Sequence, residues 1–385
     1  MKKTAIILIT VISIAFSETF PLISSLSESG SIVNTTYFNA GAAFPTNSSS
    51  MSLNPAVPAA WHYFSQNKAS IFGTYTASGN REFDFYKTGG GGSLALGKGK
   101  YVGMEYNLRN ENNSRKFHRA TISYGSLIDD NFEDDPLFIG ANISFCGFNG
   151  SLPKSGLLPI RKDTVSHGAN YYFYDSFVRD VKARYNAVST DLGFYQSGTK
   201  KVLSWGITLE NILGCSWTSN NPHLQSKLTP EILLTSDSSV ITINYDSTYY
   251  EFSEKETIGF LNKKYNDFLL AANVSLPFAN NKVLLMVPLD LRFWGFMNKD
   301  LRKSTKLKHR TEVHSGAELQ LNHIICGRFG WAWIPEIYKT FENGQLDYTG
   351  WKNHFSGGLG INIKMVSIDM FFTKDSWGGG LSFQL

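Results

Sequence analysis

The sequence lacks any long hydrophobic run after its first seventeen residues. No later segment approaches the roughly 18 uninterrupted apolar residues that a membrane-spanning helix needs, which argues against a helical membrane protein. Cysteine is scarce too: Cys146, Cys215 and Cys326 are far apart, form no CxxC pair and have no nearby histidine at metal-ligand spacing. No metal site is predicted. The cysteines are either isolated apolar strand positions or include one disulfide.

Charge is also in short supply. Charged residues make up 18% of the chain, against a usual figure of about 25%. The formal net charge of +4 falls to +2 without Lys2 and Lys3, so nucleic-acid binding has no electrostatic support. The sequence contains no HExxH motif, no Gly-x-Ser-x-Gly turn and no glycine-rich loop before a helix. We therefore predict a protein that is not an enzyme and carries no cofactor.

The first seventeen residues have the composition of an export signal. Lys2 and Lys3 give a basic start, residues 6–16 are apolar, and Ala15 and Ser17 are small residues of the kind that signal peptidase reads. The alternative, a membrane anchor, needs about 20 apolar residues, which is more than this run supplies. We predict a signal peptide over residues 1–17 that is cleaved before Glu18, and hence an exported protein.

Aromatic residues and glycine are abundant instead. Aromatics make up 14% of the chain, with 28 Phe and 18 Tyr, and there are 34 glycines. From roughly Ser70 to the end, apolar side chains stand at every second position in short segments separated by polar or glycine-rich turns. Successive side chains of a strand point to opposite faces, so each segment predicts a strand with one apolar and one polar face. A clear example sets Leu203, Trp205, Ile207 and Leu209 against Ser204, Gly206, Thr208 and Glu210.

About fourteen such segments occur, each close to the roughly 9–11 residues that a tilted strand needs to cross a bilayer. An even number suits a closed antiparallel barrel, and closure leaves no unpaired backbone edge in lipid. Residues 380–385 alternate to the last position, as the terminal strand of such barrels does. The predicted fold is all-β: a transmembrane antiparallel β-barrel of about fourteen strands over residues 67–385, in the bacterial outer membrane.

The connections between these strands are of two kinds. Asn280-Asn281 and residues 196–200 are short, as expected on the periplasmic side. Long polar connections are predicted to face the cell exterior, and these are residues 129–136, 147–170, 298–309 and 335–350. The basic stretch 302–310 fits either a solvated loop or a binding site for lipopolysaccharide phosphates or an acidic partner.

Residues 18–66 break the alternation. The stretch 38–56 is small, turn-rich and uncharged, and an apolar segment with little strand periodicity is expected to be buried. We predict that residues 18–66 form a hatch, or plug, inside the barrel. Its larger apolar side chains are candidates for lining a hydrophobic ligand pocket, with plain packing as the alternative: Phe38, Phe44, Met51 and Leu53.

Charged residues within the strands are expected to face the lumen. A lysine or arginine on the lipid face at mid-depth costs about 2–4 kcal/mol. These charges either pair across the lumen and hold the hatch, or form a polar path or head-group site. The predicted lumen-facing set is Glu105, Arg119, Glu210, Asp290, Arg292, Glu312, Glu318 and Asp369.

Several short motifs resemble a known family in their order and spacing. Asn54-Pro55-Ala56 is similar to the hatch motif of FadL-type outer-membrane proteins, although Val57-Pro58 follows where a Gly-Leu pair is usual. The nearer resemblance is to the PorV/PorQ branch. It is carried by Asp191-Leu192-Gly193, a hairpin ending at Asn211, Gly316-Ala317-Glu318, Arg328-Phe329-Gly330, Gly358-Leu359-Gly360 and Ile368-Asp369.

The resemblance implies two functions without choosing between them. One is a conduit for hydrophobic compounds such as long-chain fatty acids, as in FadL-type proteins. The other is a PorV-like scaffold that assists protein secretion or surface attachment. The implied partners are outer-membrane lipid together with hydrophobic small molecules or secreted surface proteins.

Overall fold

The chain divides into two compact units. In the computed structural model they comprise Met1–Gly147, Asn186–Trp217 and Gly259–Leu385 for the first, and Phe148–Tyr185 and Thr218–Ile258 for the second. The predicted signal peptide, Phe38 and Phe44 lie outside the residues that the structure describes. The described residues are 40, 42–43, 48–78, 85–111, 115–129, 135–164, 170–197, 202–218, 224–229, 249–252, 268–293, 306–339, 346–374 and 376–385.

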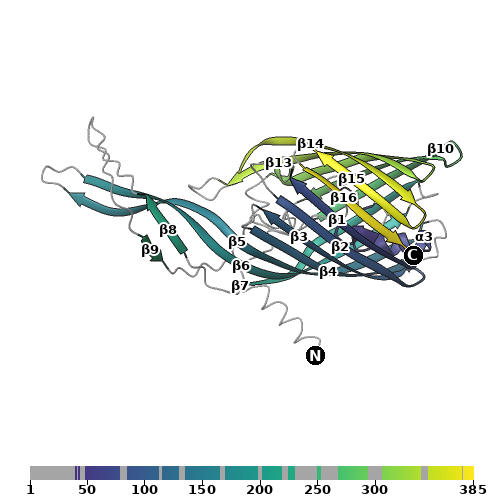
Figure 1. Cartoon of the computed structure of the whole chain (residues 1–385), viewed down its shortest axis with the longest axis horizontal. Helices are drawn as coiled ribbons and strands as arrows, with labels where there is room; N and C mark the ends of the chain where they lie inside the picture. Colours follow the sequence, from purple (N-terminus) through teal and green to yellow (C-terminus); the bar gives the residue numbers. More distant parts are fainter. Residues whose placement is uncertain are drawn as a thin grey trace, which may run out of the picture. The chain divides into compact units, whose positions relative to one another are not determined.

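Fourteen antiparallel strands close into a barrel, which confirms the predicted fold (Figure 1). Around the ring the order is β5-β4-β3-β2-β1-β16-β15-β14-β13-β12-β11-β10-β7-β6, and β6 pairs back onto β5. The strands are β1 (Ala69–Ser78), β2 (Phe85–Gly97), β3 (Lys100–Glu111), β4 (Arg115–Asp129), β5 (Leu137–Thr164), β6 (Asn170–Ser197), β7 (Leu203–Thr218), β10 (Phe268–Phe278), β11 (Val283–Phe293), β12 (Thr311–Leu321), β13 (Ile325–Lys339), β14 (Leu346–Ile363), β15 (Val366–Thr373) and β16 (Ser376–Gln384).

The alternation in the sequence becomes an alternation between the outer and inner faces of the barrel. Met104 is 66% exposed, whereas its neighbour Glu105 is 2% exposed. The outer face is apolar all round the ring, a surface that suits hydrocarbon and would be unfavourable in water. Its most exposed members include Ile71, Ile122, Phe145, Phe355, Leu359, Met370 and Phe372.

The two edges of the barrel differ. One edge, here called the turn edge, holds the tight turns β2–β3, β10–β11, β12–β13 and β14–β15, and the chain also ends there. Asn280 and Asn281 both adopt left-handed φ values, 55° and 66°, which asparagine tolerates better than most residues. The opposite edge, called the loop edge, holds the connections β1–β2, β3–β4, β11–β12, β13–β14 and β15–β16.

The acidic connection 129–136 was wrongly predicted to lie with the long exterior loops. Strict antiparallel alternation places the end of β4 and the start of β5 at the turn edge. Gln196, near the end of β6 at the same edge, donates to the Asp135 carbonyl at 3.2 Å. The length and charge of this connection therefore gave the wrong edge of the barrel. The number of strands that precede it gives the right one.

The second unit is a small antiparallel sheet. Apart from Thr218 at the end of β7, its described residues belong to β5, β6, β8 (Leu224–Thr229) and β9 (Tyr249–Phe252), which pair in the order β5-β6-β8-β9. The helices within the described residues are η1 (Ser48–Ser52), α3 (Val57–Ser65) and η4 (Leu307–Arg310). Across the described ranges, none of the helices has the length and apolar character to cross a membrane.

Candidate functional site

The described N-terminal residues fold into a buried segment inside the barrel, here called the hatch (residues 40, 42–43 and 48–66). It comprises η1, a turn and α3, which contacts β2, β3 and β4. Pro58 lies in the first turn of α3, where a backbone N–H would have no helical partner. Gln66 caps the end of the helix with a left-handed φ of 59°, and its N–H donates to the His62 carbonyl at 3.1 Å. Val57-Pro58, the departure from the family pattern, thus begins the helix.

Asn54 of the predicted Asn54-Pro55-Ala56 motif forms hydrogen bonds both within the hatch and to the barrel wall. The side chain is fully buried. Its Nδ2 donates to the Ala42 carbonyl at 2.8 Å and to the Phe194 carbonyl of β6 at 2.9 Å, while its Oδ1 accepts from the Ala56 N–H at 3.0 Å. These three bonds need two N–H donors and one acceptor. A side-chain amide supplies them, whereas a hydroxyl has one donor and a carboxylate has none.

Four other strands hold the hatch through side-chain contacts to its backbone. Tyr101 of β3 donates to the Pro55 carbonyl at 2.7 Å, and Asn142 of β5 donates to the Met51 carbonyl at 2.7 Å. Ser204 of β7 donates to the Ala43 carbonyl at 2.8 Å, and Asp290 of β11 accepts from the Ala42 N–H at 3.1 Å. The contacts satisfy backbone groups that would otherwise be buried without partners.

A row of buried inward-facing glycines makes room for the hatch. A Cβ on Gly140 would lie 2.1 Å from the Pro55 carbonyl oxygen, and one on Gly193 would lie 2.1 Å from Asn54 Oδ1. Side-chain carbons do not approach other atoms so closely, so only glycine fits. Each of the strands β3 to β7 contributes one member of this glycine seat, namely Gly103, Gly125, Gly140, Gly193 and Gly206.

Apolar packing completes the seat. Phe138 is fully buried against α3, with its ring centroid 5.6 Å from that of Tyr63 and 6.1 Å from that of Tyr195. Met51 and Leu53, the described members of the predicted ligand lining, are also fully buried, and Leu53 packs with Leu269 and small residues of the hatch and β10. In this conformation these two side chains offer no surface to a ligand.

The eight charged residues predicted to face the lumen are all buried on the inner face, each at most 8% exposed. The structure brings them into separate ion pairs and hydrogen bonds rather than one site. Glu312 lies 2.9 Å from His314 on the same strand, and Glu105 accepts from Asn107 at 2.8 Å. These short-range pairs need no cross-lumen contact.

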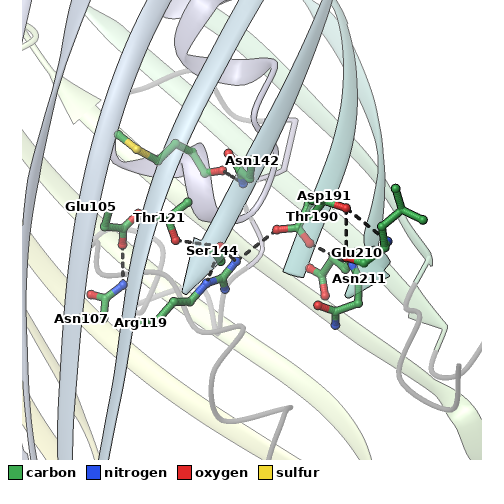
Figure 2. A network of polar contacts seen from close by, with 12 residues as sticks. Glu105, Asn107, Arg119, Thr121, Asn142, Ser144, Thr190, Asp191, Glu210 and Asn211 are labelled. Atoms are coloured by element: carbon green, nitrogen blue, oxygen red, sulfur yellow. Dashed lines mark hydrogen bonds and ion pairs between the residues drawn. The ribbon is translucent and has the colours of Figure 1, made fainter. Parts of the chain in front are cut away.

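Figure 2 shows a network of polar contacts in which Arg119 of β4 contacts two neighbouring strands. Its guanidinium donates to Ser144 Oγ of β5 at 3.0 Å and to the Asp191 carboxylate of β6 at 3.1 Å. Further along the ring Arg292 of β11 donates to Glu210 of β7 at 2.7 Å. Arg119 therefore links three strands of the wall, and Arg292 links two.

A second arginine centre lies on the opposite wall. Arg328 of β13 donates through Nε to Glu318 of β12 at 2.6 Å and through Nη1 to Asp369 of β15 at 2.5 Å. The second bond passes over β14, where a Cβ on Gly360 would lie 2.5 Å from the Asp369 carboxylate. All three charged groups are nearly inaccessible to water. A buried cation thus neutralises two carboxylates from different strands.

His62 latches the end of α3 to the wall. Its Nδ1 bonds the Asn67 carbonyl at 2.7 Å and its Nε2 bonds Ser93 Oγ of β2 at 2.8 Å. Since a carbonyl only accepts, Nδ1 carries the proton and Nε2 accepts from the serine. The ring also packs against Trp61 and Tyr101. Burial lowers the pKa of His62 below its ordinary value, and the bond to Asn67 partly opposes this.

We expect acid to weaken this latch. Because the pKa of His62 is lower in the folded protein than in an unfolded chain, its contribution is complete above about pH 6.5 and is lost as the pH falls through the lowered pKa. The protection of α3 amides from hydrogen exchange, taken relative to the intrinsic exchange rate at each pH, should fall on acidification more in the wild type than in His62→Gln. An equal loss of protection in both proteins would contradict this role.

Sequence reasoning missed several of the residues that position the hatch. Asn142, Ser204 and Tyr101 were not singled out, nor was the glycine seat. A signal was available, because glycine recurs at the inward phase of five consecutive strands of one wall. The predicted disulfide alternative is not observed for Cys146 and Cys326, which are free thiols.

The fold and the site together define a plugged transmembrane-type β-barrel: a closed ring of strands, apolar outside and polar inside, with an N-terminal segment lodged in its lumen. No protein-family model and no curated protein matches the sequence.

Solved structures show more precisely which barrel it resembles. The chain is similar to the CymD monoaromatic hydrocarbon channel (11% identity, 91% of this chain and 96% of that chain covered, TM-score 0.54). It is also similar to a Pseudomonas aeruginosa FadL homologue (10% identity, 93% and 98% covered, TM-score 0.52) and to the P. putida toluene transporter TodX (10% identity, 88% and 94% covered, TM-score 0.50). The fold is therefore that of FadL-type barrels, while the PorV/PorQ resemblance stays a prediction.

Proposed function

We propose that this protein is a conduit for hydrophobic small molecules in the bacterial outer membrane, made with a signal peptide over residues 1–17. The observation that carries the proposal is the hatch, which packs against apolar side chains of the wall and is hydrogen-bonded to six strands without a covalent bond to them. Single hydrogen bonds each contribute about 0.5–1.5 kcal/mol and can be exchanged.

The orientation follows from the two edges. Short turns face the periplasm and longer loops the exterior in barrels of this kind, so we place the turn edge and the hatch toward the periplasm. The apolar outer face would meet lipid. A hydrophobic compound entering at the loop edge would then meet the hatch before it reached the periplasm.

Support for the substrate class comes from the similar structures, whose names describe a monoaromatic hydrocarbon channel and a toluene transporter. We propose long-chain fatty acids or compounds of comparable hydrophobicity as the cargo. The burial of Met51 and Leu53 means that the hatch must shift before these side chains could contact a ligand.

Uptake by cells tests the transport role. Deletion of the gene should reduce entry of radiolabelled oleate and of labelled toluene, and restoration of the wild-type gene should recover it. Entry of a small hydrophilic solute should be equal in both strains, because the hatch closes the lumen to it. If the deletion strain took up oleate and toluene as fast as the wild type, the proposal would be wrong.

A second candidate function is a scaffold for protein secretion or surface attachment, as the PorV/PorQ resemblance implies. One observation favours it: β5 and β6 each have 28 residues, whereas about 9–11 cross a bilayer. Parts of these strands form the second unit together with β8 and β9, and a sheet of this kind offers surface to a protein partner. A variant with a shortened β5–β6 hairpin should lose surface proteins while retaining oleate uptake if this role is the right one.

A further inference from the structure

The outer face of the barrel carries a tryptophan cluster on β13 and β14, which are neighbours in the sheet (Figure 1). The rings of Trp333 and Trp351 stack with centroids 4.0 Å apart, and Trp331 donates from Nε1 to Asn353 at 3.1 Å. Residues Ile325 to Trp333, counted from the turn edge, number nine, about one bilayer crossing. Tryptophan concentrates where hydrocarbon meets head groups, so this cluster marks the membrane boundary at the loop edge.

Cations lie just beyond this boundary. Val313 of β12 pairs with Trp333, and the chain immediately before β12 forms η4, which contacts β13. Lys306 and Lys308 are both exposed there, and we call them the basic patch. The turn is fixed locally, since Thr311 donates to the Leu307 carbonyl at 2.9 Å and the His309 N–H donates to the Lys306 carbonyl at 3.0 Å.

The surroundings of the patch are electropositive and partly apolar. The pKa of His309 lies below its ordinary value, through slight burial and then through the charges of Lys308 and Lys306. Leu307, between the two lysines, is 56% exposed. A phosphate attached to an acyl chain satisfies both features, because the phosphate neutralises the cations while the chain contacts apolar surface.

We propose that the basic patch binds the phosphate groups of a lipid A-type glycolipid in the outer leaflet, with the acyl chains lying along the tryptophan cluster of β13 and β14. A free acidic protein could neutralise the lysines but would not use the adjoining lipid-facing tryptophans. The inference uses the orientation proposed above and does not depend on the transport role. It predicts a lipid bound at one place on the rim rather than a uniform annulus.

Native mass spectrometry of the full-length detergent-solubilised protein tests the proposal. Bisphosphorylated lipid A is titrated against the same lipid after phosphatase treatment, and the phosphorylated form should bind more tightly. The double variant Lys306→Gln, Lys308→Gln should weaken its binding by about 25-fold, or about fivefold for each lysine. Binding of the dephosphorylated lipid should change little.

The matched control removes two exposed lysines from the turn edge, Lys100→Gln with Lys282→Gln, and should leave lipid A binding unchanged. Equal affinity for the two lipids, an equal loss in both double variants, or no loss in the first would overturn the site. Competition by inorganic phosphate or by polyglutamate at matched charge would assign the patch to a free anion or to an acidic protein, and would also overturn it. Heat-modifiable electrophoretic mobility checks that both variants remain folded.

Discussion

Replacing Gly193 by valine is expected to unseat the hatch and open the barrel. A Cβ at this position would lie 2.1 Å from Asn54 Oδ1 and 2.7 Å from Pro55 Cδ, so the Asn54-Pro55-Ala56 turn cannot keep its place. The strand itself tolerates the change, because valine favours β structure. Entry of a chromogenic cephalosporin, hydrolysed by a periplasmic β-lactamase, should rise severalfold over the wild type.

The control for this experiment is Gly73→Val on β1. A Cβ on Gly73 would have no atom within 4 Å, so valine there changes the wall without touching the hatch. Cells with this variant should admit the cephalosporin at the wild-type rate. If Gly193→Val cells stayed as tight as the wild type, the glycine seat would not be what retains the hatch.

Loss of Arg328 should have the largest effect on stability. Arg328→Met removes the cation that bonds Glu318 and Asp369 at 2.6 Å and 2.5 Å. Breaking a buried ion pair from one side typically costs about 3–5 kcal/mol, because a charge is left without compensation. The free energy of unfolding, measured by urea titration of the micelle-bound barrel with tryptophan fluorescence, should fall by about this amount.

A neutral triple variant separates charge from packing. Adding Glu318→Gln and Asp369→Asn to Arg328→Met removes both uncompensated carboxylates, so most of the lost free energy of unfolding should return. A triple variant as unstable as Arg328→Met alone would show that the arginine acts through its volume. In that case the ion pairs would contribute little to the wall.

The barrel itself was predictable from the sequence because its two solvents are opposite in character. Lipid outside and polar groups inside impose a period of two, and a shift by one residue would place Glu105 in hydrocarbon and Met104 in the lumen. Because every strand carries this alternation, the strands could be counted in the sequence, and the predicted number of about fourteen is confirmed. Within the predicted hatch, residues 50–62 are buried, as their apolar composition predicts.

The side of each connection was less predictable. Residues 129–136 are long and acidic, like an exterior loop, yet β4 and β5 meet at the turn edge. Length and charge describe a connection locally, whereas its side depends on how many strands precede it.

The sequence by itself determined which face of each strand meets lipid, since that information is local and repeats along every strand. Tertiary structure decided which inward residues meet. Asp290 reaches the Ala42 N–H across 248 positions of the chain, and Arg328 bonds Asp369 across an intervening strand. Such partners depend on the strand register and on the closure of the ring, which set the depth of every side chain in the lumen. Neither can be deduced from the sequence of one strand alone.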